Sequence, residues 1–239
     1  MSLSRADLRV DWCSHEAAKY AVENWHYSKR MPSSKLAKLG VWENDEYIGC
    51  VIFGSGANKG AGKRFDLTQF QVCECVRVAL HRHLSPVSQI VTVAVKMVKE
   101  EYKKLRLIVS YADPEQGHSG SIYQAMNWIY AGDTTPADEF VLRGRIWHGR
   151  GLRSTLTGMG LYAGTTLERA TLLDASAIKQ KGSSKHRYLY PLDKGMRRRI
   201  LPLSRPYPKR EESMCGFGVN GDIAGDQLEE AGSIPASRS

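Results

Sequence analysis

The sequence predicts a mixed α/β protein, in which a central mixed sheet is flanked by helices and followed by a basic C-terminal extension. Helix and strand patterns alternate through residues 1–150, which predicts one main α/β unit. A buried-type strand at 105–114 follows a strand at 71–80 across an intervening helix, which predicts one parallel crossover near the centre of the sheet. The 239 residues, of which 42% are apolar, suffice for a sizeable core.

Periodicity and turn residues predict the first elements. Residues 15–25 place apolar side chains at helical spacing, and Ser14 is the expected N-cap of this helix. Residues 39–53 form two β-rich runs joined at Asn44 and Asp45, which predicts a hairpin.

A glycine-rich segment, residues 54–63, follows the hairpin. It lacks the spacing of a phosphate-binding P-loop, because Arg64 follows Lys63 where that motif has Ser or Thr. We therefore expect a flexible loop here. The next run, residues 71–80, alternates with period two and is rich in β-branched residues, which predicts a strand.

The crossover helix is expected to begin at Ser85 and Pro86, as N-cap and first helical residue, and to present one apolar face. The apolar strand that follows ends at Asp113 and Pro114. Later elements are expected at 119–132 (a short helix running into a strand), 139–150 (a strand) and 165–177 (a helix).

The net charge of +9 is concentrated in one part of the chain. Residues 1–142 hold 17 Lys and Arg against 16 Asp and Glu, residues 143–210 hold 16 against 3, and residues 211–239 hold 1 against 6. The middle segment alone therefore carries +13, and aromatic residues are interleaved with its charges. Such a segment favours a polyanionic partner, because each phosphate contact releases a counterion.

Cysteine usage and hydropathy limit the class of protein. The five cysteines include no CxxC pair, which argues against a zinc ribbon and a disulfide framework and favours a reducing cytoplasm. The N-terminal residues have no apolar run of the secretory type. No segment approaches the roughly 18 apolar residues of a membrane span, so no membrane partner is expected.

Three residues follow the central strand at the place where α/β folds bind ligands. Asp113 is either a turn-forming residue before Pro114 or a group of an active site. His118, in the loop that follows, is either an exposed loop histidine or a ligand or base. Tyr123, in the next helix, is either a core aromatic residue or a residue that faces the site.

Two further groups hold polar side chains near apolar ones. Arg77 shares a strand face with Cys73 and Cys75, which are expected to be small buried residues. An arginine there requires a carboxylate partner or an anionic ligand. His26 and Tyr27 end the first helix beside a basic loop, as a stacking patch for nucleic acid, as metal ligands, or as a simple helix C-cap.

The segment 119–132, SGSIYQAMNWIYAG, resembles the helix A-x-x-L-Y-x-x-x-G-F of the GNAT acyltransferase superfamily. In that superfamily the Tyr protonates the departing thiolate of coenzyme A, so the resemblance implies this role for Tyr123. The family's glycine loop for pyrophosphate is replaced by HRHLSPVSQI, which has no glycine. Helix amides and the hydroxyls of Ser85 and Ser88, together with Arg77, remain as groups that could hold an anionic donor.

Longer segments resemble the Mom proteins of Mu-like bacteriophages, over roughly residues 11–210. They are DWCSHEAAKYAVENWHYSKRMP, KLAKLGVWENDEYIGCVIFGSGA, CVRVAL with SPVSQIV, ADPEQGHSGSIYQAMNWIYAG and KHRYLYPLDKGMRRRILPLSRPYP. The resemblance implies a GNAT-like enzyme that transfers a carbamoylmethyl group to N6 of adenine in DNA and so protects the phage genome from host restriction. It also implies bound iron, a small-molecule donor (acyl-CoA-like or derived from glycine), and action in the cytoplasm of the infected bacterium.

The resemblance and the residues together assign candidate roles. The catalytic candidates are Asp113 (base or metal ligand), Tyr123 (acid or ligand), Arg77 and Ser88, and the donor-binding candidates are Ser85, Ser88 and Arg77. The candidate iron ligands are His26, Tyr27, Asp113 and His118. The expected contacts to double-stranded DNA are Lys29, Arg30, Arg143, Arg145, Arg150, Arg153, Lys185, Arg187, Arg197, Arg198 and Arg199.

Three regions are expected: a catalytic core (1–150), a basic DNA-binding extension packed on it (151–210) and a disordered acidic tail (211–239). Two other functions stay open. One is a GNAT acetyltransferase that acts on a protein or a small amine, and the other is a DNA-binding protein without catalysis. The oligomeric state is left open.

Overall fold

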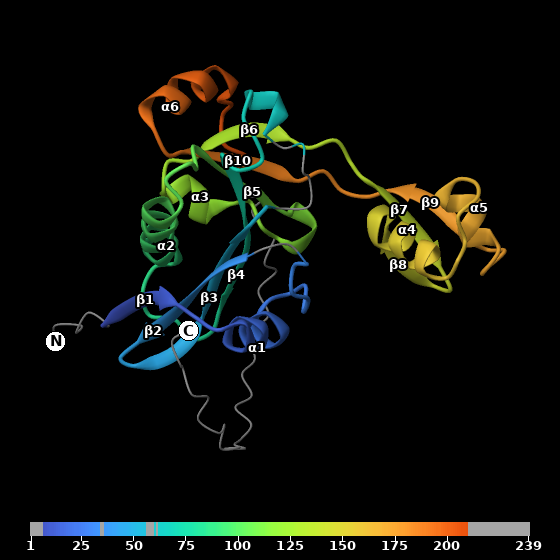
Figure 1. The fold of residues 1–239 in the computed structure, drawn as a ribbon, viewed down its shortest axis with the longest axis horizontal. Coiled ribbons are helices and arrows are strands. Elements are labelled where there is room, and N and C mark those ends of the chain that lie inside the picture. Colours follow the sequence, from blue (N-terminus) through green and yellow to red (C-terminus); the bar gives the residue numbers. More distant parts are fainter. Residues whose placement is uncertain (1–6, 34–35, 56–59, 61, 210–239) are drawn as a thin grey trace, which may run out of the picture.

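The computed structural model describes residues 7–33, 36–55, 60 and 62–209. In these residues the strands form a seven-stranded sheet of order β1-β2-β3-β4-β5-β10-β6 and a three-stranded sheet of order β8-β7-β9. The large sheet is mixed and has helices on its faces (Figure 1), which confirms the predicted fold class. The acidic tail and half of the glycine-rich segment 54–63 lie outside the described residues.

The N-terminal elements are β1 (Leu8–Trp12), α1 (His15–Trp25), β2 (Leu36–Glu43) and β3 (Glu46–Gly54). The predicted cap of α1 is confirmed, because the Ser14 hydroxyl accepts a hydrogen bond from the Ala17 amide at 3.1 Å. The hairpin is also confirmed: Asn44 and Asp45 have φ of 51° and 66°, as a type I′ turn requires. β1, which was not predicted, pairs with β2 at the edge of the sheet.

The crossover consists of β4 (Val72–Leu80), α2 (Val87–Glu101) and β5 (Leu107–Ala112). β4 and β5 are parallel, as predicted. The expected N-cap was wrong: α2 begins after Pro86, and Ser85 makes no side-chain cap. The Ser85 amide instead donates to the carboxylate of Glu43 at 2.7 Å, so a distant acidic residue satisfies the amide before the helix.

After β5 come α3 (Ser121–Ala125), β6 (Ile129–Asp133) and a unit that projects from the large sheet (Figure 1). This projecting unit, residues 138–181, contains β7 (Asp138–Leu142), β8 (Arg145–His148), α4 (Gly149–Gly158), α5 (Thr166–Thr171) and β9 (Ile178–Lys181). The prediction of a single strand over residues 139–150 was therefore wrong. Arg143 and Gly144 both have positive φ and fold that segment into a hairpin. The helix expected at 165–177 ends at Thr171.

The chain then returns to the large sheet as β10 (His186–Pro191), which lies between β5 and β6 and antiparallel to both. It continues into α6 (Lys194–Ile200) and a short 3₁₀ helix, Leu201–Leu203. The boundary expected at residue 150 thus falls inside the projecting unit, and the segment after it supplies a central strand.

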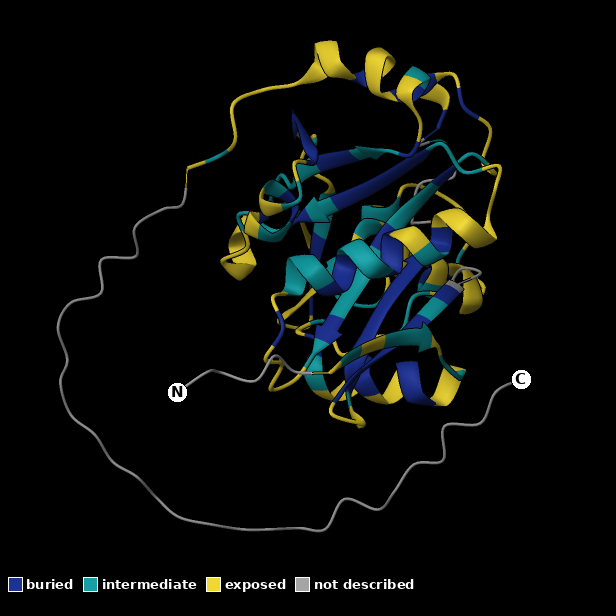
Figure 2. Cartoon of the chain, turned by 90° about the vertical axis from the view of Figure 1, so that its left-hand side faces the viewer, coloured by how far each residue is buried: buried dark blue, intermediate teal, exposed yellow. Residues whose placement is uncertain are grey.

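Helices cover both faces of the large sheet. Alternate residues of β5 show this, since Ile108 joins the cluster formed by α2 and α3, whereas Leu107 and Val109 join the cluster formed with α6. α1 packs on the same face as α6, against β3 and β4. Figure 2 shows the buried strands beneath helices whose outer sides are exposed.

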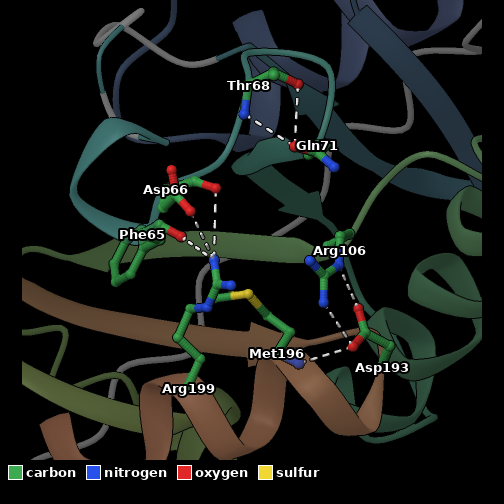
Figure 3. A network of polar contacts seen from close by, with 8 residues as sticks. All are labelled: Phe65, Asp66, Thr68, Gln71, Arg106, Asp193, Met196 and Arg199. Atoms are coloured by element: carbon green, nitrogen blue, oxygen red, sulfur yellow. Dashed lines mark hydrogen bonds and ion pairs between the residues drawn. The ribbon is translucent and has the colours of Figure 1, made fainter.

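Polar contacts fix α6 to the sheet (Figure 3). Asp193 caps α6 by accepting from the Met196 amide at 2.7 Å, and it pairs with Arg106 at 2.8 Å. At the other end of the helix, Arg199 donates to the carbonyl of Phe65 at 2.7 Å. Among the described residues, no helix is long and apolar enough to span a membrane.

Candidate active site

A cleft opens where the two parallel strands of the crossover separate. β4 and β5 pair only from Val72 with Leu107 to Glu74 with Val109. Next to this point the register between β3 and β4 shifts by a bulge, which turns β4 away from β5. The Ser110 hydroxyl donates to the Cys75 carbonyl at 3.0 Å and so satisfies a carbonyl that the parallel ladder no longer reaches.

The cleft has a volume of about 530 Å³ and is lined by the end of α1, by β4, by the end of β5 with its following loop, and by α3. The structure brings together six residues that the sequence predicted from separate segments. They are His26, Tyr27, Arg77, Asp113, His118 and Tyr123. Ser85 and Ser88 do not line it.

Tyr123 lies on the α3 side of the cleft with only 7% of its surface exposed. Its hydroxyl is 2.7 Å from the Ser110 hydroxyl. Because Ser110 has one proton and gives it to the Cys75 carbonyl, the Tyr123 hydroxyl donates to Ser110. Burial raises the pKa of Tyr123 well above its usual value, so the phenol stays protonated at neutral pH.

His26 is buried at the end of α1 and is neutral at physiological pH. Its Nδ1 accepts from the Ser28 amide at 3.0 Å, which places the ring proton on Nε2. Burial lowers its pKa to about 4, and the positive charge of Arg77 and then that of His118 act in the same direction. The ring therefore offers the cleft a hydrogen-bond donor.

Aromatic rings surround this histidine. The Tyr27 ring lies 4.3 Å from that of His26 and 5.6 Å from that of His118, measured between centroids. Tyr27 is half exposed at the mouth of the cleft. Trp25, which also lines the cleft, stacks on His81 with an angle of 10° between the rings. This side of the cleft can accept a flat ring by stacking.

Arg77 supplies a positive charge inside the cleft. Its guanidinium donates to the carbonyl of Val76 at 2.6 Å and to that of Arg30 at 3.3 Å. It belongs to none of the ion pairs formed in the described part of the chain. Burial lowers its pKa, and the guanidinium remains charged. Of the two expectations for Arg77, the geometry favours an anionic ligand.

The Asp113 carboxylate is fixed by neighbouring protein groups. Its carboxylate pairs with Lys185 at 2.9 Å and accepts from the Glu115 amide at 3.2 Å. Ser183 approaches the same group at 3.5 Å. Asp113 therefore ties the end of β5 to the segment that leads from the projecting unit into β10, and it caps the short helix Pro114–Gln116.

Ser85 and Ser88, the expected donor-binding residues near the start of α2, do not line the cleft. The amides of Leu84 and Ser85 both donate to the carboxylate of Glu43, at 2.6 and 2.7 Å. Burial opposes ionisation of this carboxylate, but the hydrogen bonds prevail and lower its pKa. Near the helix start, His83 and Val87 line the cleft instead.

The expected DNA contacts divide into two sets. Lys185 pairs with Asp113, and Arg199 donates to Phe65. The other members lie in the loop after α1, in the projecting unit, in β10 and in α6. Eight other side chains of the expected set belong to none of the ion pairs formed between the described residues. Seven of these are exposed: Lys29, Arg30, Arg143, Arg145, Arg153, Arg197 and Arg198.

Iron fits the four expected ligands poorly. In the part of the chain that the structure describes, no three His, Cys, Asp or Glu side chains group as ligands of one metal ion. Nδ1 of His26 is bonded to Ser28, and the carboxylate of Asp113 is bonded to Lys185. Tyr27 and His118 adjoin His26, but they do not complete a His-and-carboxylate set.

Residues that sequence reasoning missed include Ser110, Tyr111 and Glu43. Ser110 lies inside an apolar strand, and a single polar residue in such a run was the available signal. Tyr111 lines the cleft from the same strand. Glu43 precedes the hairpin turn and gave no signal of its contact with residues more than forty positions away.

The site is a cleft at the split of a parallel strand pair, with a buried phenol on one side and a cation and aromatic rings on the other. This arrangement is typical of α/β proteins that bind a ligand at strand ends. The model of the Mom protein family matches residues 7–209, so the chain belongs to the Mom protein family. It is similar to the methylcarbamoylase Mom of Escherichia phage Mu, with 26% identity over 212 residues that cover 85% of this chain and 84% of the relative.

A solved structure, that of a proposed acetyltransferase from Acinetobacter baylyi ADP1, is 15% identical and covers 80% of this chain and 96% of its own, with a TM-score of 0.46.

Proposed function

We propose that this protein is a phage DNA-modification enzyme that transfers a carbamoylmethyl group to N6 of adenine, and so protects phage DNA from host restriction. The observation that carries the proposal is the cleft itself, in which a protonated phenol, Tyr123, faces a cation, Arg77, and a set of aromatic rings. Membership of the Mom family and the similarity to the methylcarbamoylase of phage Mu support it. The enzyme would act inside the infected bacterium.

The cleft suits an adenine taken out of the duplex. N6 lies inside the base stack, so the enzyme must extrude the nucleotide, at a cost of a few kcal/mol, or capture it unpaired. The Tyr27 ring at the mouth of the cleft can stack on the base, and the Nε2–H of His26 can donate to a ring nitrogen. The +13 charge of residues 143–210 supplies attraction to the duplex.

Transfer forms a bond between N6 and the donor carbon and breaks the bond from that carbon to the leaving group. The N6 proton passes to water in the open cleft, and water later returns a proton to Tyr123 once the leaving group has taken its own. Tyr123 is the candidate acid, since its raised pKa keeps a proton available for the leaving group. Ser110 holds that proton before transfer. Arg77 would bind a negative charge on the donor or its leaving group. The donor is an activated small molecule, either acyl-CoA-like or derived from glycine.

Mass spectrometry of nucleosides from cells that express the chain tests the proposal. We expect a modified adenosine in the wild type and its loss in Tyr123→Phe. Acetylated protein or amine with unmodified DNA would instead identify an acetyltransferase. DNA binding without either product would leave a protein that binds DNA and does not catalyse.

A further inference from the structure

Arg187 lies on the face of the large sheet that carries α6, beside the cleft, and two further arginines, Arg64 and Arg205, approach it from other segments. Arg187 in β10 lies directly across the ladder from Tyr111 of β5, and Tyr111 lines the cleft. The register between β10 and β6 is irregular at this point, and Arg187 Nη2 donates to the carbonyl of Ala131 at 2.6 Å. Its Nε is buried and has no hydrogen-bond partner. A charged donor is thus buried and only partly satisfied.

Arg205 approaches the same place from the segment after α6. Its amide donates to the Tyr130 carbonyl at 2.9 Å, so this segment runs along β6. Its guanidinium lies against Gly132, where an added Cβ would be 3.1 Å from Nε and 3.2 Å from Cζ. Gly132 also has a φ of +76°, so glycine both permits the backbone turn and leaves room for the arginine.

Arg64, the third member, is exposed in the short helix Lys63–Phe65 and lies over the Phe65 ring at 5.4 Å. Phe65, the residue after Arg64, packs in one apolar cluster with Tyr111, the ladder partner of Arg187, so Arg64 comes close to Arg187. Burial lowers the pKa of Arg187 most, and the positive charges of Arg64 and Arg205 act in the same direction. None of the three forms an ion pair with a described carboxylate.

The Asp133 carboxylate offsets part of this positive charge, since Arg187 contributes to lowering its pKa, but Asp133 pairs with His186. The buried Nε–H of Arg187 therefore still lacks an acceptor, which is unfavourable unless an anion binds there. A phosphate suits the arrangement, because its oxygens accept the paired donors of guanidinium groups. We propose that Arg64, Arg187 and Arg205 bind one phosphate group at the edge of the cleft. The proposal rests on the proposed function, under which a backbone phosphate of the target strand is the expected source. A phosphate on the small donor is the other source.

The first arm of the test measures binding of a short fluorescent DNA duplex by anisotropy over a range of salt concentrations. Arg187→Gln, Arg64→Gln and Arg205→Gln are each compared with wild type and with Lys99→Gln. Lys99 is exposed on α2, on the opposite face, and its substitution removes the same charge. If DNA supplies the phosphate, each arginine variant should bind about five- to tenfold more weakly near 0.1 M salt, and the slope of log K against log salt should fall by about one.

The second arm measures the melting temperature with inorganic pyrophosphate. If the donor supplies the phosphate, duplex binding should match the control, whereas the rise in melting temperature seen for wild type should be lost in the arginine variants. Arginine variants that match Lys99→Gln in both arms would overturn the site. Arg64 and Arg205 are exposed, so these variants keep the test valid if Arg187→Gln does not fold. If the protein does not modify adenine, the proposed function is refuted. The duplex binding and the melting temperature would still show whether the three arginines bind a phosphate.

Discussion

The two walls of the cleft satisfy their polar groups in different ways. On the α3 wall, Tyr123 donates to Ser110, which donates to the Cys75 carbonyl, so each hydroxyl proton has a fixed acceptor. On the α1 wall, the Nε2–H of His26 and the charge of Arg77 have no carboxylate partner among the described ion pairs. The first wall positions a proton, whereas the second presents donors and a positive charge to a ligand.

The strand separation produces this difference. The α3 wall is built at the last residues where β4 and β5 are still close, so its groups bond to one another. The α1 wall is built beyond the bulge, where β4 has turned away and its side chains meet the helix end and solvent. Substitutions that remove one polar group from each wall should therefore differ in their effects on catalysis, binding and stability.

The largest effect is expected for Tyr123→Phe, which removes the hydroxyl that bonds to Ser110 on the α3 wall. If the hydroxyl supplies a proton in the transfer, adenine modification should fall by roughly 10²–10⁴-fold. The ring and its packing remain, so the free energy of unfolding should fall by less than about 1.5 kcal/mol. Nucleoside mass spectrometry and thermal unfolding measure the two effects.

Tyr130→Phe is the matched control. The Tyr130 hydroxyl donates to Asp133 at 2.7 Å, and Tyr130 does not line the cleft. This variant should lose similar stability and keep its activity. If Tyr123→Phe modifies adenine at a near-normal rate, the hydroxyl has no role in the transfer and Tyr123 is a core aromatic residue.

The next largest effect is expected for Arg77→Met, which removes the positive charge of the α1 wall and keeps an apolar stem. Loss of a charge-assisted contact to an anion should lower kcat/KM for the donor by about ten- to hundredfold. Arg9→Met is the control, because Arg9 stacks on Trp42 at 4.2 Å in β1 and β2, at the edge of the large sheet. Equal kinetics in the two variants would exclude an anion-binding role for Arg77.

The third prediction concerns the α1 wall and the pH dependence of the free energy of unfolding that His26 causes. The folded protein holds the pKa of His26 at about 4, below the usual value of 6.5, so the unfolded chain binds a proton first as the pH falls. The stability that the neutral ring contributes is fully present above about pH 6.5 and is lost as the pH falls toward 4. The loss should reach about 1–3 kcal/mol.

Urea unfolding of His26→Gln should show a flatter pH dependence between 4.5 and 6.5, a range above the lowered pKa values of the carboxylates. His15→Gln, at an exposed position of the same helix, should keep the wild-type slope. If both variants keep that slope, burial of a neutral His26 does not contribute to stability in this range.

Local signals account for what the sequence predicted correctly. The α1 helix with its Ser14 cap and the Asn44-Asp45 hairpin depend on neighbouring residues, and both were found. β1 was missed because five residues with two charges resemble a loop. Several residues that line the cleft were found because they lie at or after the end of the central strand, Asp113 directly and Tyr123 in the next α-helix.

Long-range contacts account for what the sequence could not give. Arg199 looked free to bind DNA, but its acceptor, the Phe65 carbonyl, lies 134 positions away. Glu43 reaches amides 41 and 42 positions away, and no local pattern marks that contact. Ser110 became informative only when the strand split placed it beside Cys75.

The smallest effect is expected for the ion pair at the end of β5, where Lys185 pairs with Asp113 at 2.9 Å. The pair is partly buried and connects the end of β5 with the segment that leads out of the projecting unit. Lys185→Met should lower the free energy of unfolding by about 1 kcal/mol, a value near the upper end for ion pairs that water reaches. Lys179→Met, which breaks an exposed pair with Asp138 at the start of that unit, should cost less. Hydrogen exchange of the amides at 182–186 should rise in Lys185→Met alone, because the lost ion pair anchors that segment to the cleft. Equal exchange in both variants would show that backbone bonds, such as that from Thr134 to the Lys185 carbonyl, hold the segment without the ion pair.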